Sequence, residues 1–547
     1  MAKMSGAKAI VEVLKEEGIK HVFQLPGSQI IDILDEIHQS PIRTIMTRHE
    51  QGAAFMADGY ARATRGMGVC MATVGPGAMN LVSGIAASYK ASIPVIAITG
   101  THSQSILERD SFHEMDQVSV FKPITKWSAS INQSEKIPEM LRKAFRIALN
   151  GRKGPVHLAI PSNVSAGEVD YDKAVTSQYR SSVPPSCPEE FIDDVVRLLK
   201  NAQFPVMFVG GEILWSKAGK DLVELAETLE IPVTTTRDHP DAFPNSHPLG
   251  MGMIGKGRGE AGNRVMKHAD LVLALGVKFD YHSTQYNYDI IPKVKIIHVS
   301  INPEEVGRIY PIELGVVCDV GPVIKSLLKK VKEYNISFGL KNIAEEIKKE
   351  SQQKKDSEID FQAVPLTPQA VIRTLREHLP PEAAIVVDGG NFAKYVRRHF
   401  DIFETDTFYY TDDFGSVGSS FPMSIGVKLA DPTRPVICLN GDGGFMFNIQ
   451  ELETAAREHI NIIVVVLNDS GFGNVRAYQK AKFQERYLCD FDNPPFGEIA
   501  KFFKADGVQV ERLDELSNAI QSALHSNKPF IIDVKINKEE LEKPVFL

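Results

Sequence analysis

The sequence is poor in cysteine, and it lacks any long uninterrupted hydrophobic run. Its five cysteines stand apart, without the spacing of a metal site or of a disulfide framework, at Cys70, Cys187, Cys318, Cys438 and Cys489. No apolar run approaches the roughly 20 residues that a membrane-spanning helix needs. The first residues lead directly into an amphipathic helical pattern and lack the features of a signal peptide. These absences predict a cytoplasmic protein in a reducing compartment, with no membrane as partner.

An excess of basic residues is also absent. The 61 Lys and Arg residues are outnumbered by 69 Asp and Glu residues, which gives a net charge of −8 at pH 7. Without a basic footprint, the composition argues against nucleic acid as a partner. The shares of hydrophobic residues (43%) and charged residues (24%) are those of an ordinary globular protein. At 547 residues the chain is too long for one core, and its length predicts about three domains.

Strand and helix patterns alternate along the chain in three units, which is typical of α/β folds with parallel sheets. We place these units at residues 1–165, 189–332 and 361–547. A polar, proline-bearing stretch joins the first two, and a stretch rich in Lys, Glu, Gln and Ser, expected to be partly helical and solvated, joins the last two. Near the start of the third unit, Thr367 followed by Pro368 predicts a helix N-terminus. The predicted fold is α/β, with three doubly wound parallel-sheet domains.

The most informative motif is a pair of polar segments in the third unit, each directly after an apolar strand. Asp442 lies in residues 439–445, Leu-Asn-Gly-Asp-Gly-Gly-Phe, ahead of a helix expected from Asn448, and Asp469 follows the strand at 462–467. Parallel strands joined by a helix end side by side, at the sheet edge where α/β folds bind ligands. Two oxygen ligands lie beside a helix N-terminus whose glycines leave the backbone accessible. This combination predicts a site for a divalent cation and a diphosphate.

This pair of segments resembles the diphosphate-binding signature of thiamine-diphosphate enzymes. The resemblance implies that Mg²⁺ is held by Asp442, Asp469 and the backbone carbonyl of Gly471. The family more often has Asn at the position of Asp469, and Asp adds a negative charge while keeping an oxygen ligand. The cofactor-binding residues implied in this unit are Gly390, Asn391, Gly415, Val417, Gly441, Asp442, Gly443, Gly444, Asp469, Gly471, Phe472 and Gly473. Among them, Val417 matches the bulky residue that holds the cofactor in its bent shape.

The resemblance extends over nearly the whole chain, as a pyrimidine-binding, a central and a diphosphate-binding domain. Residues 47–62 look like the family segment whose Glu activates the cofactor, and by that match the activator is Glu50. Thiamine diphosphate needs a carboxylate at the far nitrogen of its pyrimidine, because the protein controls the cofactor's protons. A Glu at a helix start also interacts favourably with the helix dipole, so this residue alone does not distinguish a catalytic role from a structural one. Gly27, Gly75 and Asn80 are expected beside Glu50 in the same cofactor site.

Within the superfamily, the chain most resembles the large subunits of acetolactate synthase, which decarboxylate pyruvate and join the fragment to a second 2-oxo acid. Ser162 stands where synthases usually carry a Lys, whose charge could hold the carboxylate of the acceptor. If this enzyme binds an acceptor, another side chain must supply the positive charge, and Arg109 and Arg476 are candidates. Two histidines near positions where the family has Gln, His102 and His113, are candidate catalytic residues for proton transfer. A simple 2-oxo acid decarboxylase therefore stays as the alternative.

The histidines could equally be loop residues bonded to backbone. Tyr478 aligns with a Trp that selects the acceptor in synthases, and Asn474 with an apolar residue, so both are candidate substrate contacts. The resemblance implies a homodimer or homotetramer, because the Glu and the metal site that serve one cofactor come from two subunits. A regulatory small subunit stays open as a further partner.

FAD in the central domain also stays open. The family contacts it through an Arg-Phe-Asp segment, which here reads Lys278-Phe-Asp280 and loses the planar fork of arginine. Gly210-Gly211 after a strand is a weak signal for a dinucleotide. A distant alternative is a dinucleotide-binding or non-catalytic Rossmann-like protein. That alternative does not explain Glu50, Asp442 and Asp469 together.

Overall fold

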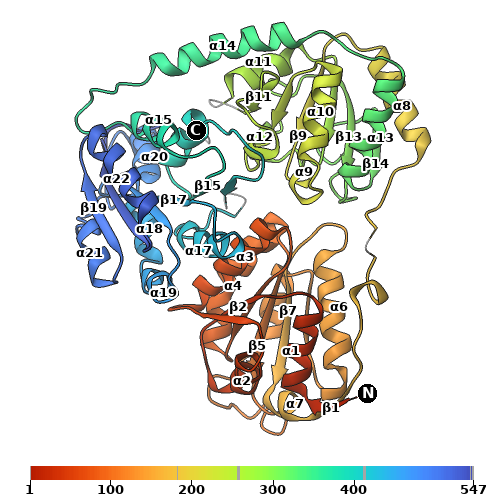
Figure 1. The fold of residues 1–547 in the computed structure, drawn as a ribbon, viewed down its shortest axis with the longest axis vertical. Coiled ribbons are helices and arrows are strands. Elements are labelled where there is room, and N and C mark those ends of the chain that lie inside the picture. The colour runs from red at the N-terminus through yellow and green to blue at the C-terminus, as the bar shows by residue number, and fades with distance from the viewer. Residues whose placement is uncertain (1, 182, 256–258, 411–413, 543, 545–547) are drawn as a thin grey trace.

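The computed structural model describes residues 2–181, 183–255, 259–410, 414–542 and 544. It has three six-stranded sheets, every one parallel and covered by helices, which confirms the predicted fold class (Figure 1). Each sheet falls within one of the ranges 1–165, 189–332 and 361–547, whose limits stay predictions. Among the described residues, no helix combines the length and the apolar character that crossing a bilayer requires.

The N-terminal sheet has the strand order β3-β2-β4-β5-β7-β6, and the chain crosses between strands through helices. Its strands are β2 (His21–Gln24), β3 (Arg43–Met46), β4 (Gly68–Ala72), β5 (Val95–Thr101), β6 (Trp127–Ser130) and β7 (Val156–Pro161). Its helices are α1 (Gly6–Glu16), α2 (Ile31–His38), α3 (Glu50–Thr64), α4 (Pro76–Ala91), α5 (Gln117–Phe121), α6 (Ile137–Leu149) and α7 (Ser162–Ala166). A two-stranded antiparallel ribbon pairs β1 (Ala2–Ser5) with β8 (Glu168–Tyr171). The central strands β4, β5 and β7 are almost entirely buried, as apolar strands covered on both faces must be.

The central sheet has the order β11-β10-β9-β12-β13-β14. Its strands are β9 (Pro205–Val209), β10 (Val233–Thr235), β11 (Gly250–Met253), β12 (Leu271–Leu275), β13 (Lys295–Ser300) and β14 (Leu314–Val317). Its helices are α8 (Glu189–Lys200), α9 (Glu212–Trp215), α10 (Gly219–Leu229), α11 (Glu260–His268), α12 (Tyr281–Thr284) and α13 (Val320–Glu333). The expected partly helical connector is α14 (Lys341–Ser357), which buries only Ala344, Ile347 and Ser351 and runs towards the C-terminal domain (Figure 1).

The C-terminal sheet has the order β16-β15-β17-β18-β20-β19. Its strands are β15 (Ala384–Val387), β16 (Phe408–Tyr410), β17 (Val436–Gly441), β18 (Ile463–Asn468), β19 (Asp506–Val510) and β20 (Phe530–Lys535). Its helices are α15 (Pro368–His378), α16 (Phe392–His399), α17 (Ser420–Ala430), α18 (Asp442–Phe447), α19 (Glu451–Arg457), α20 (Gly473–Phe483), α21 (Phe496–Phe502) and α22 (Leu513–His525). Thr367 caps α15 through its side chain, as predicted.

The helix expected to open at Asn448 is wrong in its start. A helix begins six residues earlier, at Asp442, and the segment forms two short helices, α18 and α19, with a break between them. The break has a physical cause, because the side chain of Asn448 donates to the backbone carbonyl of Gly418 over 2.8 Å. A short polar side chain that bonds to backbone elsewhere competes with helix continuation.

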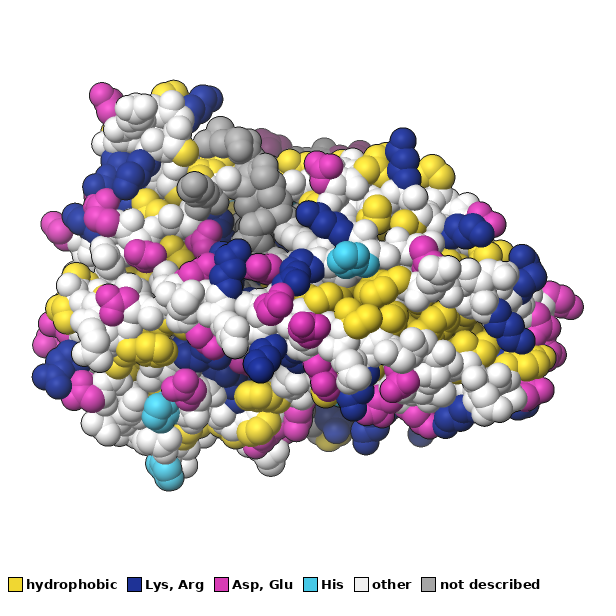
Figure 2. Space-filling model, turned by 90° about the horizontal axis from the view of Figure 1, so that it is seen from above, with side chains coloured by type: hydrophobic (Ala, Val, Ile, Leu, Met, Phe, Trp, Pro, Cys, Tyr) yellow, Lys and Arg dark blue, Asp and Glu magenta, His cyan; other side chains and the backbone are white. Residues whose placement is uncertain are grey.

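The N-terminal and C-terminal domains share one hydrophobic core, in which α3 packs against α17 (Figure 1). The two helices approach closely at glycines. A Cβ at Gly59 would lie 2.2 Å from the carbonyl oxygen of Met423, and one at Gly426 would lie 2.0 Å from that of Met56. Only glycine permits such an approach of two backbones. The outer face seen in Figure 2 intersperses acidic and basic side chains, without a broad area of one sign.

Candidate functional site

A cavity of about 340 Å³ lies at the carboxyl edge of the C-terminal sheet. All twelve residues that the sequence predicts as cofactor contacts in this domain line it, from Gly390 to Gly473. Further lining residues include Pro368, Phe392, Tyr395, Val475, Ile536 and Glu540. Its volume lies in the range of about 300–1,000 Å³ that is typical of cofactor sites. The predicted residues, scattered over more than eighty positions, are therefore gathered around one space.

Asp442 and Asp469 come together because β17 and β18 are adjacent and parallel, with Gly441 opposite Leu467. Asp442 is only 1% exposed, and its Oδ2 accepts from the backbone N–H of Gly471 over 3.0 Å. Burial, and after it the neighbouring carboxylate of Asp442, raises the pKa of Asp469 well above its usual range. The buried carboxylate of Asp442 and the partly buried carboxylate of Asp469 lie in each other's electrostatic field, next to the backbone of Gly471. They form a donor set that suits a hard divalent cation.

The donor set has two acidic side chains rather than three, because the third expected ligand is a backbone carbonyl. Consistently, the described part of the chain contains no cluster of three or more His, Cys, Asp or Glu side chains suited to a metal. Asn493 was not predicted from the sequence, yet its side chain donates to both Asp442 and Asn468. It lies in an irregular segment, where no periodic pattern marks it.

The loop that carries Val417 is held by Asp388, a fully buried residue at the end of β15. The backbone N–H of Gly418 donates to Asp388 Oδ2 over 2.8 Å, and burial raises the pKa of Asp388 to about 7. Gly415 and Gly418 adopt φ values of +71° and +80°, which favour glycine. Val417 is 38% exposed and lines the cavity. The sequence signal for Asp388 is its place between a strand and two glycines.

The predicted residues of the N-terminal domain form a second group at the carboxyl edge of their own sheet. Glu50 is the first residue of α3, is 5% exposed, and accepts from Asn80 Nδ2 over 2.9 Å. Gly75 precedes α4, and Gly27 follows β2 and packs against Thr73. Of the described N-terminal residues, none lines the cavity of the C-terminal domain. Within one chain, the Glu50 group and the Asp442 group thus lie in separate places.

The two candidate histidines differ in their surroundings. His102 donates from Nε2 to the backbone carbonyl of Phe112, so the interpretation as a backbone-bonded loop histidine describes its geometry. His113 is exposed, with φ of +67°, and its ring stacks on Phe112 at 3.6 Å between centroids. Its carbonyl faces Gly75, where an added Cβ would lie 2.4 Å away. His113 therefore borders the Glu50 group.

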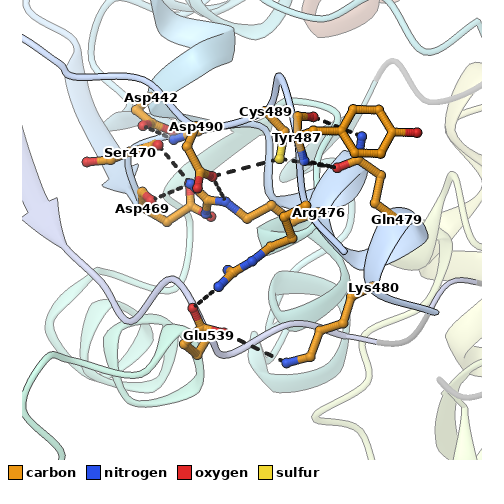
Figure 3. A network of polar contacts seen from close by, with 12 residues as sticks. Asp442, Asp469, Ser470, Arg476, Gln479, Lys480, Tyr487, Cys489, Asp490 and Glu539 are labelled. Atoms are coloured by element: carbon orange, nitrogen blue, oxygen red, sulfur yellow. Dashed lines mark hydrogen bonds and ion pairs between the residues drawn. The ribbon is translucent and has the colours of Figure 1, made fainter. Parts of the chain in front are cut away.

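The residues expected to contact substrate are also separated. Asn474 lines the cavity of the C-terminal domain, and Tyr478, one turn further along α20, does not. Arg109 is exposed on a loop of the N-terminal domain. Arg476, the other candidate partner for an acceptor carboxylate, is fully buried and engaged with Asp469 (Figure 3). The hypothesis that Arg476 receives an acceptor carboxylate is therefore wrong, because its guanidinium is occupied within the protein.

Models of the thiamine pyrophosphate enzyme family match the chain in three places. The N-terminal TPP binding domain matches residues 4–120, the central domain residues 192–327, and the C-terminal TPP binding domain residues 388–534. These ranges contain the Glu50 group, the central sheet and the cavity with Asp442, in that order.

Curated proteins resemble the chain over its full length. A probable acetolactate synthase large subunit of Methanocaldococcus jannaschii is 34% identical, over 98% of this chain and 93% of that protein. The acetolactate synthase large subunit of Haemophilus influenzae is 31% identical, over 100% and 96%. The large subunit of acetolactate synthase isozyme 2 of Escherichia coli is 30% identical, over 98% and 96%. The chain belongs to the thiamine pyrophosphate enzyme family, in the group that includes the acetolactate synthase large subunits.

Proposed function

We propose that this enzyme uses thiamine diphosphate and Mg²⁺ to decarboxylate a 2-oxo acid, with pyruvate as donor, and joins the two-carbon fragment to a second 2-oxo acid. The observation that carries the proposal is the cavity at the C-terminal sheet, which gathers every predicted diphosphate contact of that domain. Similarity to acetolactate synthase large subunits over nearly the whole chain supports the choice of reaction. Mg²⁺ suits the oxygen donors Asp442, Asp469 and the carbonyl of Gly471.

Some residues of this chain would hold the cofactor in place, and others would control its protons. When bound, thiamine diphosphate supplies the nucleophilic carbon and the electron sink for decarboxylation. Glu50, oriented by Asn80, holds a proton at the far pyrimidine nitrogen. Val417, presented by a loop that Asp388 holds, would pack against the bound cofactor. The cavity glycines would let the backbone approach the diphosphate. At Gly444 the protein itself also requires glycine, because a Cβ there would lie 2.3 Å from Asp388 Oδ2.

We infer that each site joins two copies of the chain in a homodimer. The Glu50 group does not line the cavity that holds Asp442, so one copy alone brings only half of the residues together. Large apolar side chains are exposed at both halves, with Phe472 and Val475 on the cavity and Phe112, 80% exposed, beside His113. A partner that completes each site would cover these apolar side chains. Relatives named as large subunits support a small subunit as a further partner.

The cavity of the central domain argues against bound FAD. The cavity at the carboxyl edge of its sheet measures about 80 Å³, far below the roughly 300 Å³ at which ligand pockets begin. Glu212 occupies the strand ends there, accepting from Ser300 Oγ over 2.6 Å and from the N–H of Ile301 over 2.8 Å. Acidic residues such as Asp319 line this space, and so do the cations Arg152, Lys153 and Lys278, so the small volume and not the charge disfavours a dinucleotide. We therefore propose a flavin-free enzyme, which purified protein without a flavin absorption band would support.

Product analysis tests the proposed reaction. The purified enzyme is incubated with thiamine diphosphate, Mg²⁺ and increasing pyruvate, and acetolactate and acetaldehyde are measured separately. We expect acetolactate to become the main product as pyruvate rises, because a second molecule must bind as acceptor. Acetaldehyde as the sole product at saturating pyruvate would support the simple decarboxylase, which Ser162 in place of Lys favours. Turnover without thiamine diphosphate would contradict both reactions.

A further inference from the structure

Arg476 on α20 is the largest fully buried side chain of the described structure. Its Nη1 donates to Asp469 Oδ2 over 2.8 Å, and its Nε donates to Asp490. Its Nη2 donates to the backbone carbonyls of Asp469 and Ser470, over 2.9 and 2.7 Å (Figure 3). One guanidinium thus binds both the side chain and the backbone of the segment that enters the proposed metal site.

The charges of this group are complementary. Asp469 adds a second carboxylate beside Asp442, and Arg476 supplies the positive charge that is closest to it. Asp490, the other partner of Arg476, has a half-exposed side chain, so water already solvates its charge. A buried charge is tolerated when a well-placed opposite charge accompanies it. Asp442, Asp469 and Arg476 together carry one net negative charge, the same as a site with a single carboxylate and an amide.

The same arginine fixes the turn that presents Gly471. A Cβ at Gly471 would lie 2.2 Å from Arg476 Nη2 and 2.3 Å from the carbonyl oxygen of Cys489, so the turn packs directly on the guanidinium. On its other side the N–H of Gly471 donates to Asp442. The planar, multiply donating fork of arginine suits this task, whereas the single ammonium of lysine cannot reach all four acceptors.

We propose that Asp469 and Arg476 act as one charge-matched pair, in which Arg476 is a positioning residue that sets the affinity of the divalent cation and the diphosphate. This inference rests on the proposed function, since it assumes that the cavity takes Mg²⁺ and thiamine diphosphate. An Asn at position 469 keeps an oxygen ligand, but it then turns its amino group towards Arg476 or gives its oxygen to Arg476 instead of the metal. Asp469→Asn alone is therefore harmful here, although the family more often has Asn at this position.

A double-mutant cycle tests the pair, with binding of thiamine diphosphate at fixed Mg²⁺ measured by calorimetry as the readout. Asp469→Asn and Arg476→Gln should each weaken binding about 10- to 100-fold, the range typical for groups that orient metal ligands. The double variant should bind more tightly than either single variant, because both the excess charge and the unpaired arginine are gone. Arg476→Lys should restore only part of the affinity that Arg476→Gln loses. Lys480→Gln, which removes a charge from the same helix at an exposed position, should bind like the wild type.

Thermal unfolding of each variant identifies those that fail to fold, and the double variant then carries the test. Single-variant losses that simply multiply in the double variant would overturn the pairing, as would wild-type binding by Asp469→Asn. A wild-type protein that does not bind thiamine diphosphate with Mg²⁺ would instead overturn the proposed function. The two failures are thereby distinguished in one experiment.

Discussion

Glu451 accepts a hydrogen bond of 3.0 Å from the backbone N–H of His49, the residue directly before Glu50. The N–H of Arg48 donates to the same carboxylate over 3.1 Å. Glu451 is fully buried on α19, the helix that follows the proposed metal-binding segment, and burial raises its pKa to about 7. The C-terminal domain of one chain therefore holds the start of α3, and with it the proposed activator of the cofactor.

Replacing Glu451 by Ala should lower both stability and turnover. Two backbone donors would lose their acceptor in a partly buried place, at a cost of about 1 kcal/mol each, the lower end of the range for buried donors. The start of α3 would be free to shift Glu50. We expect a lower thermal midpoint and a lower kcat, with Glu498→Gln, which changes an exposed glutamate on α21, as control. Unchanged kcat in a folded Glu451→Ala variant would show that this contact does not position Glu50.

Glu50→Gln should leave binding of thiamine diphosphate nearly unchanged and reduce turnover by about 10²–10⁴, the usual cost of a lost proton-transfer partner. Glutamine keeps the shape of the side chain and an oxygen for Asn80. Steady-state rates and calorimetric binding separate the two effects. Activity within a few-fold of the wild type would remove Glu50 from its proposed role.

Asp442→Ala should abolish the Mg²⁺-dependent retention of thiamine diphosphate. The change removes one charged oxygen ligand and the acceptor of the Gly471 N–H, so both the metal and the turn lose a contact. Gel filtration with and without Mg²⁺, followed by cofactor quantification, provides the measurement. Asp431→Asn, in a turn ahead of the same strand, should retain the cofactor. Equal retention by both variants would argue against Asp442 as a ligand.

Mixed dimers should recover activity that neither parent has. If each site takes Glu50 from one chain and Asp442 from the other, a dimer of one Glu50→Gln chain and one Asp442→Ala chain contains one intact site and one doubly altered site. Differently tagged chains, purified over both tags, should then show about half of the wild-type activity per dimer. Inactive mixed dimers would indicate that each site is built from a single chain.

Acid should destabilise the N-terminal domain through His157. This residue is buried on β7 between Thr99 and Ser128 and stacks on Phe121, and burial lowers its pKa from 6.5 to about 3. Below pH 6.5 the imidazole of His157 is protonated in the unfolded chain but stays neutral in the folded chain. Stability therefore falls by about 1.4 kcal/mol per pH unit down to pH about 3. The thermal midpoint of His157→Gln should decline less steeply over this range, and parallel profiles would refute the assignment.

The strands, the three parallel sheets and the meeting of Asp442 with Asp469 could be predicted from the sequence. These features depend on short apolar runs, on capping residues such as Thr367, and on the rule that parallel strands end at one edge. Each signal is local or follows from chain topology, so no knowledge of packing was needed. The resemblance to the family supplied the residues of the cavity and the role expected of Glu50.

Only the tertiary structure showed the contacts between segments that neither local pattern nor strand order connects. Glu451 contacts the segment before Glu50, and Arg476 is buried against Asp469. No local pattern in the sequence indicates these contacts, or the start of α18 at Asp442. The approach of α3 and α17 at Gly59 and Gly426 is of the same kind. Such contacts depend on how whole layers pack and on which buried polar groups must find partners, and those constraints arise only when the chain is folded.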